Sequence, residues 1–533
     1  MNTKQEKVTD EVKPTLGNLP EQYEYEPKRT WSVTEMSSKE MLLRKGLKNF
    51  DNRDLLYPHT GQPAAWKQRL KNKEVRVSRK YLYTAVAVCN LSSIALGITL
   101  TWSSPVISKL NGEVKTDDNP LGRLITIDEE SWIGSLITLG AAAGPYTGGL
   151  LADRIGRRKT LILTAGVPSL ISFIMLAFAS DIYVYYIARF VGGISIGAIY
   201  SVLPSYISEI SEDKNRGAMG SVMNVFITVG LCWSYVIGPF VTIRTFSLIC
   251  ATVPAVFIVW FSFFPESPYH YVAVDKPEKA EAALQRLRMA TADDVRKEME
   301  LIKATVDDSK NKQLGFVDLF KSKGLTKALI ISMSLVAFQQ LSGINVVLFY
   351  TQTIFEATGS SISSVFSSII IGGAQMIPSA ITPCVADTAG RRATLMFSAI
   401  GQIISEIPLG LYFYLKHSGH DVSAIYWLPV ACLVVYIITF RVGFGPLPWT
   451  IMAEIFPSNV KTAACTATAS FCYILAFLIT RFFQNLTVYI GMEGGFWLFS
   501  GFCILSAIFI YLYVPETKKK SFQEIQRILN GEN

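Results

Sequence analysis

The chain has 533 residues, of which 50% are hydrophobic and only 17% are charged, and its formal net charge is +8. Several apolar runs approach or exceed the roughly 20 residues that a membrane-spanning helix needs, which excludes an ordinary soluble protein. Membrane proteins gather lysine and arginine in their cytoplasmic loops, so the positive charge reflects topology and does not indicate a nucleic-acid partner.

The first 79 residues are polar and of mixed charge. They contain no basic segment followed by an apolar core and a cleavage site, so they do not form a signal peptide. We predict that 1–79 is a retained cytoplasmic tail, and we expect it to be disordered.

From residue 80 onward, the apolar runs predict an all-α membrane protein with twelve transmembrane helices. The predicted spans are 80–102, 131–152, 159–180, 182–208, 218–240, 244–264, 325–350, 362–385, 393–415, 425–455, 462–484 and 493–514. An even number of spans puts both termini on one side. The loops on the same side of the membrane as the termini hold more basic residues than the loops on the other side. Both termini are therefore expected to be cytoplasmic.

The spans divide into a bundle at 80–270 and a second bundle at 325–514, followed by a cytoplasmic tail at 515–533. Between the bundles, 271–324 is rich in charged helix-forming residues and too poor in apolar runs to cross a membrane. We predict a cytoplasmic linker of short amphipathic helices there.

The two bundles share a sequence repeat. Asp-x-x-Gly-Arg-Arg ends the second span and the eighth span, and a carboxylate seven residues before a basic residue follows the fourth and the tenth. A Pro-Glu pair follows the sixth and the twelfth. The charged members are Asp153, Arg157, Arg158, Glu209, Arg216 and Glu266 in the first half, and Asp387, Arg391, Arg392, Glu454, Lys461 and Glu516 in the second.

This repeat indicates duplication of a six-helix unit, which is typical of one transporter architecture. Arginine pairs offer bidentate donors to carboxylates, so we predict that each set forms a cytoplasmic latch that is closed in the outward-open state and broken in the inward-open state. The alternative is a set of solvated topology markers, because exposed ion pairs contribute only about 0–1 kcal/mol each.

The segment QQLSGINVVLFY, 339–350, places three uncharged amides inside the seventh span: Gln339, Gln340 and Asn345. Successive helical residues turn by about 100°, so a straight helix cannot aim all three at one ligand. We therefore predict a break at Ser342-Gly343. Amides both donate and accept hydrogen bonds, which suits a neutral ligand rich in hydroxyl groups, although interhelical bonding is an alternative use.

Two charges fall within apolar spans, Glu406 in the ninth and Arg441 in the tenth. Both lie 14 residues from a cytoplasmic anchor, or about 21 Å of helix rise. We predict that they form an ion pair; the alternative is that Glu406 titrates and couples a proton. Arg189, at the start of the fourth span, is expected to serve helix packing.

With both Gly-Arg-Arg motifs, PSYISEISEDKNRG, PESP, QQLSGIN, GFGPLPW, AEIFPSNVK and PETK, the stretch from about 80 to 528 resembles the sugar-porter family of the major facilitator superfamily. EESWIGSL and TWSSPVI are most similar to insect facilitated trehalose transporters. The resemblance implies two pseudo-symmetric six-helix bundles (the major facilitator fold), and it implies the same latch.

The resemblance also assigns roles to single residues. It implies sugar contacts for Gln339, Gln340, Asn345, Asn224 and Gln375, and an aromatic flank for Trp449. Phe349 and Tyr350 correspond to the outer gate, with ordinary packing as the alternative. From their own chemistry, Gly443, Gly445, Pro446 and Pro448 are expected to break the tenth helix.

Three positions depart from the family pattern. Cys472-Tyr473 stand where many relatives have Asn-Trp, Lys461 stands where Arg is usual, and Arg441 stands where many have Glu. The first of these departures puts the exact substrate, and transport itself, in question.

We predict facilitative uniport of a neutral sugar, trehalose or a hexose such as glucose, because 81–102 lack the carboxylate of proton-coupled relatives. A proton symporter and a non-transporting sugar sensor are the alternatives. No catalytic constellation, cofactor motif or metal-ligand spacing stands out, so we expect no enzyme activity, no cofactor and no metal. The expected setting is the lipid bilayer of the plasma membrane, crossed several times by a monomer.

Overall fold

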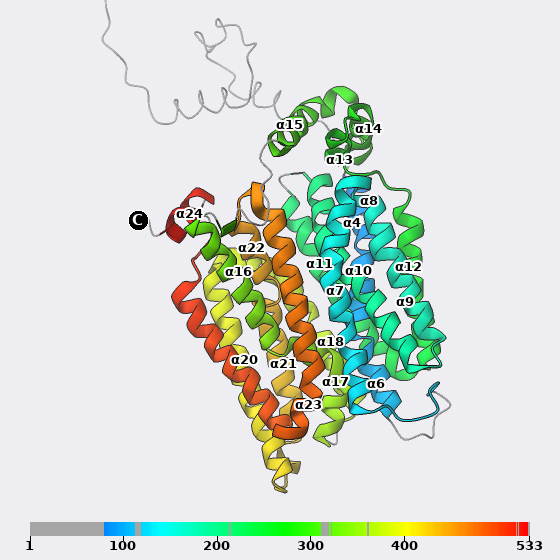
Figure 1. Cartoon of the computed structure of the whole chain (residues 1–533), viewed down its shortest axis with the longest axis vertical. Helices are drawn as coiled ribbons and strands as arrows, with labels where there is room; N and C mark the ends of the chain where they lie inside the picture. The colour runs from blue at the N-terminus through cyan, green and yellow to red at the C-terminus, as the bar shows by residue number, and fades with distance from the viewer. Residues whose placement is uncertain are drawn as a thin grey trace, which may run out of the picture. The chain divides into compact units, whose positions relative to one another are not determined.

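The computed structural model describes residues 79–111, 119–212, 215–310, 319–320, 322–359, 362–518, 520 and 522–530. The predicted tail 1–79 lies outside these ranges except for its last residue. Within them the chain forms helices joined by turns and contains no strand (Figure 1).

Ten helices in the described ranges are long and apolar enough to cross a membrane. They cover Lys80–Asn111, Arg157–Ala177, Ile182–Ile210, Arg216–Phe240, Ile243–Phe261, Lys323–Thr358, Ser364–Thr382, Arg391–His417, Ser423–Ile455 and Ala463–Tyr513. The helical membrane architecture predicted from the sequence is thus confirmed.

Two further features account for the difference between ten and the predicted twelve. Helix α7 (Ile127–Ile155) is 29 residues long but begins with three acidic residues and is rich in glycine, which lowers its hydropathy. Helix α23 (Ser458–Tyr513) has 56 residues and is broken at Gly491, where φ is +73°. A single helix of that length would rise about 84 Å, far more than the ~30 Å of a bilayer core, so it supplies two crossings.

The first bundle consists of α4 (Lys80–Cys89), α5 (Leu91–Thr101), α6 (Ser103–Asn111), α7, α8 (Arg157–Thr160), η1 (Leu161–Gly166), α9 (Val167–Ala177), α10 (Ile182–Ile210), α11 (Arg216–Ile237), η2 (Gly238–Phe240) and α12 (Ile243–Phe261). Side chains fix several helix starts. Thr126 and Glu129 form a reciprocal capping box at the start of α7, and Asp181 accepts the Tyr183 N–H at the start of α10.

The second bundle consists of α16 (Lys323–Leu341), α17 (Ile344–Thr358), α18 (Ser364–Ala374), α19 (Met376–Ala389), α20 (Arg391–His417), η4 (Ser423–Ile425), α21 (Leu428–Val442), α22 (Leu447–Ile455) and α23, followed by α24 (Phe522–Asn530). Between the bundles lie the predicted short helices, α13 (Pro268–Ala273), α14 (Pro277–Arg288) and α15 (Ala292–Lys310).

The linker helices have a small core of their own, built from residues such as Val272, Leu284 and Ile302. Arg288 attaches them to the first bundle, since its Nη1 donates to the carbonyl of Ile210 at the end of α10 (2.8 Å). The linker therefore lies at the end of the bundle where α10 finishes and α8 begins (Figure 1). We call this the Gly-Arg-Arg end and the other the opposite end.

Glycines allow α7 and α10 to pack closely. A Cβ atom on Gly144 would lie 2.5 Å from the Cα of Gly197, and one on Gly140 would lie 3.0 Å from the Cα of Gly193. Helices in lipid associate through such small residues, because backbones in close contact gain packing that lipid tails do not offer. The low hydropathy of α7 is the sequence signature of this packing.

Both predicted helix breaks are present. Gly343 separates α16 from α17 with φ +80°, and residues 443–446 separate α21 from α22. A left-handed φ favours glycine, because a Cβ atom there clashes with the backbone. The break at Gly343 is also crowded, since a Cβ atom would lie 2.5 Å from the Phe499 ring.

We expect Gly343→Ala to lower the free energy of unfolding by about 1–3 kcal/mol, because it combines a strained φ with a clash. The measurement is thermal unfolding of the purified protein in detergent. Gly373→Ala is the matched control, since a Cβ atom there meets nothing within 4 Å and alanine suits a helix better than glycine. Equal melting temperatures for the two variants would contradict the prediction.

Candidate functional site

The three amides of the seventh span gather around Cys472 in the second bundle, whose Sγ donates a long bond to Gln339 Oε1 (4.0 Å). Gln340 Nε2 donates to Cys472 Sγ (3.1 Å), and Asn345 Nδ2 donates to Gln340 Oε1 (2.6 Å). Gln339 Nε2 donates to the carbonyls of Phe444 (2.6 Å) and Gly445 (2.9 Å). The break at Gly343 lets residues from α16 and α17 converge. Gln339 connects this break to the one between α21 and α22 through its bonds to the two carbonyls.

Most of the hydrogen-bonding capacity of this amide group is already used within the protein. Gln339 and Gln340 are 5% and 8% exposed, and their NH₂ groups are already bonded to protein atoms. Asn345 is only half-buried, and an amide has further donor and acceptor capacity beyond its single bond to Gln340. In this structure the two glutamines thus make the interhelical hydrogen bonds that were the alternative to sugar binding. Asn345 is the amide that remains accessible to a ligand.

The departure at Cys472 has a structural consequence. Its sulfur accepts the Gln340 bond, although sulfur is a weak acceptor. The thiol therefore belongs to the amide group but binds Gln340 less firmly than an amide or hydroxyl oxygen would.

Three aromatic rings join the bundles beside the amide group. Trp449 of α22 stacks on Tyr200 of α10, with ring centroids 6.1 Å apart and planes 13° apart, and Tyr473 lies 6.3 Å from the same ring. Trp449 therefore faces the other bundle, as a residue flanking a ligand must. Sequence reasoning missed Tyr200, because a tyrosine in an apolar span carries no signal beyond ordinary packing.

Asn224 lies on the face of α11 that meets the second bundle. One turn further along, Thr228 bonds to Ser379 of α19 (2.8 Å), and residues four apart share a helix face. Asn224 is half-buried and so remains available to a ligand between the bundles.

The predicted ion pair between Glu406 and Arg441 is wrong. Arg441 instead donates from Nε (3.0 Å) and Nη2 (2.8 Å) to the amide oxygen of Gln375. Gln375 is fully buried, and its NH₂ group donates to the Ile371 carbonyl (3.1 Å), so it faces Arg441 and not an open space. Counting residues from an anchor predicts depth, but the direction a side chain takes around the helix depends on packing.

Glu406 lies inside the second bundle. It is 2% exposed and lies beside Tyr436 and Cys503, and its Oε2 has no hydrogen-bond partner among the residues described. Its neighbours come from α21 and α23 of the same bundle. Arg189 takes the predicted packing role, bonding the carbonyls of Thr99 (2.7 Å) and Ile133 (2.9 Å).

At the opposite end, α17 closes against the first bundle. Phe349 and Tyr350 are both buried, and the Phe349 carbonyl accepts from Ser103 of α6 (3.4 Å). The Tyr350 ring lies against Gly134 of α7, where a Cβ atom would be 2.9 Å from its Cζ. The two predicted gate residues thus lie in the contact between the bundles.

A polar network extends this contact along α6 and α17. Gln352 Nε2 donates to Ser108 (2.8 Å) and to Glu356 (3.2 Å), and Ser108 also donates to Glu356. The Gln352 backbone N–H bonds to Ser104 (3.1 Å). These bonds connect α17, the second half of the broken seventh span, to the first span.

A second polar network joins α7 to α23. Glu130, 5% exposed, accepts from Asn111 (2.9 Å) and from Gln484 of the second bundle (2.9 Å). Arg481 donates to Ser131 (2.8 Å) and pairs with Asp128. Sequence reasoning missed this network, because each residue lies at the polar end of a span and the partners from the two bundles are about 350 residues apart.

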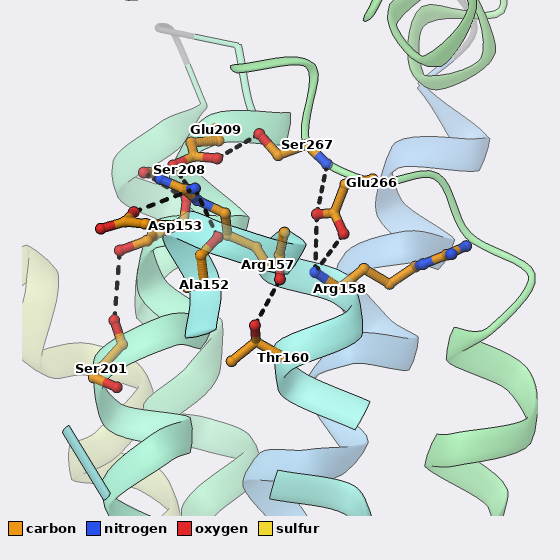
Figure 2. Close-up of polar contacts among 12 residues, drawn as sticks. Ala152, Asp153, Arg157, Arg158, Thr160, Ser201, Ser208, Glu209, Glu266 and Ser267 are labelled. Carbon is orange, nitrogen blue, oxygen red and sulfur yellow. Dashed lines mark hydrogen bonds and ion pairs between the residues drawn. The ribbon is translucent and has the colours of Figure 1, made fainter. Parts of the chain in front are cut away.

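At the Gly-Arg-Arg end, the first-half latch residues gather only in part (Figure 2). Arg157 bonds Glu209 (3.0 Å) and, more loosely, Asp153 (3.5 Å), and Ser267 also donates to Glu209. Arg216 donates to the Ser208 carbonyl (3.2 Å).

Glu266 does not bind the arginine side chains, contrary to the simple form of the prediction. Its carboxylate accepts the backbone N–H groups of Arg158 (2.9 Å) and Lys159 (3.4 Å), and it also accepts from Ser267 N–H (3.0 Å). The first N–H groups of a helix lack intrahelical partners and attract negative charge, so Glu266 caps α8. The Arg158 guanidinium instead bonds the carbonyls of Ser262 and Phe264.

The second half repeats this arrangement. Arg391 bonds Glu454 (3.0 Å), while Glu516 accepts the N–H groups of Arg391 (3.0 Å) and Arg392 (3.1 Å). Burial opposes ionisation of Glu516, but N–H donors of Lys518, Arg391 and Arg392 outweigh it and lower its pKa. The Asp387 side chain lies outside what the structure describes, and the contacts described for Lys461 include no carboxylate.

Comparison with known proteins gives the family. The family model described as "Sugar (and other) transporter" matches residues 68–529. The facilitated trehalose transporter Tret1-1 of Drosophila sechellia is 35% identical over 85% of this chain and 52% of its own length. Tret1 of Culex quinquefasciatus is 34% identical over 83% of this chain and 84% of its own length.

Most of the matched relatives are longer than the Culex protein, and the chain spans about half of their length. The partially occluded inward-open structure of the xylose transporter XylE from E. coli has a TM-score of 0.69 to this chain, with 22% identity over 83% of this chain and 99% of that one. This likeness shows the fold alone. The family model and the Culex relative establish that the chain belongs to the sugar-transporter family.

Proposed function

We propose that the protein carries a sugar, trehalose or a hexose, across a membrane by facilitative uniport. The observation that supports this most directly is the uncharged amide group at the break of the seventh span, next to rings that join the bundles. Amides replace the hydrogen bonds that water gives to hydroxyl groups, and an aromatic face packs on the apolar face of a pyranose. The names of the insect relatives favour trehalose.

The places where the bundles touch support alternating access. The hydrogen bonds that described residues make between the bundles lie at mid-depth, as for Thr228 with Ser379, or at the opposite end, as for Glu130 with Gln484. A state closed at one end implies a counterpart in which those contacts break and the Gly-Arg-Arg end closes. The charged sets at that end would then act as the latch, with the termini cytoplasmic and the protein a plasma-membrane monomer that performs no catalysis.

Proton symport is less well supported. The first span, Lys80–Asn111, contains no acidic residue, and Glu406 lies among side chains of its own bundle and not between the bundles. A coupling carboxylate must be reached by a proton in both transport states, which a site enclosed in one rigid bundle does not provide.

The test is uptake of radiolabelled trehalose and glucose by oocytes, each at two pH values. Uniport predicts uptake down a gradient with little pH dependence, whereas a symporter loses uptake as external pH rises. A sensor would bind sugar without flux, and absence of both binding and flux would overturn the proposal.

We expect Gln340→Ala to lower sugar uptake about tenfold, because the substitution removes a sugar contact and leaves the Asn345 amide without its hydrogen-bond acceptor. Gln402→Ala is the matched control, since Gln402 is also fully buried in the second bundle but bonds Ser398 and Cys503. Equal losses in both variants, at equal surface expression, would show that the amide matters for packing and not for sugar.

A further inference from the structure

Arg441 carries a positive charge in the middle of a membrane span without a negative partner. It lies in the last turn of α21, before the break at Gly443. Its hydrogen-bond partner, Gln375, is neutral, and no carboxylate acts on it electrostatically in the part of the chain that the structure describes. The end of a helix favours a cation, but that effect is smaller than the penalty for an uncompensated charge in a membrane.

The Gln375 bonds leave the guanidinium ready to bind. Nε and Nη2 share one amide oxygen, which fixes the plane of the group. A guanidinium has five N–H donors, so Nη1 and the second Nη2 hydrogen still form a two-pronged edge. That edge matches the two oxygens of a carboxylate.

The guanidinium lies within electrostatic reach of the other bundle. The phenol groups of Tyr200 and Tyr235, from α10 and α11, are the ionisable side chains that act on it. Tyr200 is the ring on which Trp449 stacks, so Arg441 lies beside the same contact between bundles as the amide group. Arg441 is half-buried, so part of its side chain remains accessible.

We propose that Arg441 binds an acidic group on the transported sugar, and that the substrate class includes monocarboxylate sugars such as uronates and aldonates. The inference rests on the proposed function. A single guanidinium neutralises a single negative charge, so a carboxylate suits it better than a phosphate dianion. A free inorganic anion such as chloride shares this chemistry, and the experiment separates the two.

The test measures binding of glucose and of glucuronate to the purified full-length protein in chloride-free methanesulfonate buffer, and again with added chloride. We expect glucuronate to bind at least about tenfold more tightly than glucose. Arg441→Gln should remove this preference, with glucose affinity changed less than about threefold, and Arg441→Lys should restore part of it because the charge remains. Arg244→Gln is the control, since Arg244 is exposed and the variant loses the same charge.

Equal affinities for glucose and glucuronate in the wild-type protein would overturn the inference while leaving the proposed function intact. Glucose binding that needs chloride, with that need lost in Arg441→Gln, would overturn it in favour of a free anion. Binding of neither sugar would overturn the proposed function itself. Size-exclusion profiles of each variant show whether a loss reflects misfolding, and in that case the wild-type comparison of the two sugars decides.

Discussion

Gly134→Leu is expected to lower sugar uptake by about tenfold or more and to hold the protein open at the opposite end. The Tyr350 ring, 1% exposed, lies against the Gly134 backbone and has no room to retreat from a leucine side chain. Closure of α17 against α7 would then be disfavoured, and each 1.4 kcal/mol against the closed state lowers its population about tenfold. Radiolabelled uptake measures the loss, and hydrogen–deuterium exchange of 344–358 should become faster.

Gly149→Ala provides the control in the same helix, because a Cβ atom there meets nothing within 4 Å. It should keep wild-type uptake and exchange. Slow exchange in α17 of Gly134→Leu, together with lost uptake, would show that the variant fails for another reason and that Tyr350 does not belong to the gate.

Glu266→Ala is expected to lower the free energy of unfolding by about 2–4 kcal/mol, because three backbone N–H groups lose a charged acceptor at a buried position. The carboxylate is 4% exposed and accepts from Arg158, Lys159 and Ser267. Thermal unfolding in detergent measures the change. Glu266→Gln should lose roughly half as much, since its amide oxygen still accepts but without charge.

Asp153→Asn is the matched control at the same end. Asp153 is 70% exposed and lies 3.5 Å from Arg157, so its loss should change stability by less than about 0.5 kcal/mol. The sequence treats Asp153 and Glu266 as equal members of one latch. Similar effects of the two substitutions would contradict the distinction that the structure makes between an exposed ion pair and a helix cap.

Several features of the site were predictable because they depend on local chemistry. Gly343 marked the helix break, since few other residues adopt its backbone conformation, and the Gly-Pro cluster marked the second break. The amides Gln339, Gln340 and Asn345 were expected to converge once the break was assumed, and they do.

Other features depended on the rotation of helices about their axes. Arg441 and Glu406 were assigned similar depths, but Arg441 faces Gln375 and the first bundle whereas Glu406 faces Cys503. Residue spacing alone could not exclude an ion pair between Arg441 and Glu406, because a rise of 1.5 Å per residue gives the depth of a side chain but not the tilt or rotation of its helix.

The sequence by itself determined the membrane setting, the duplicated charge motifs and the family, because hydrophobic runs, glycine breaks and motif spacing are properties of short segments. Only the tertiary structure decided which partners each polar group meets. It joined Glu130 to Gln484, set Trp449 on Tyr200 and left Arg441 without an anion. These contacts arise where two bundles, hundreds of residues apart along the chain, pack with one relative position, and side-chain packing across that contact sets the position.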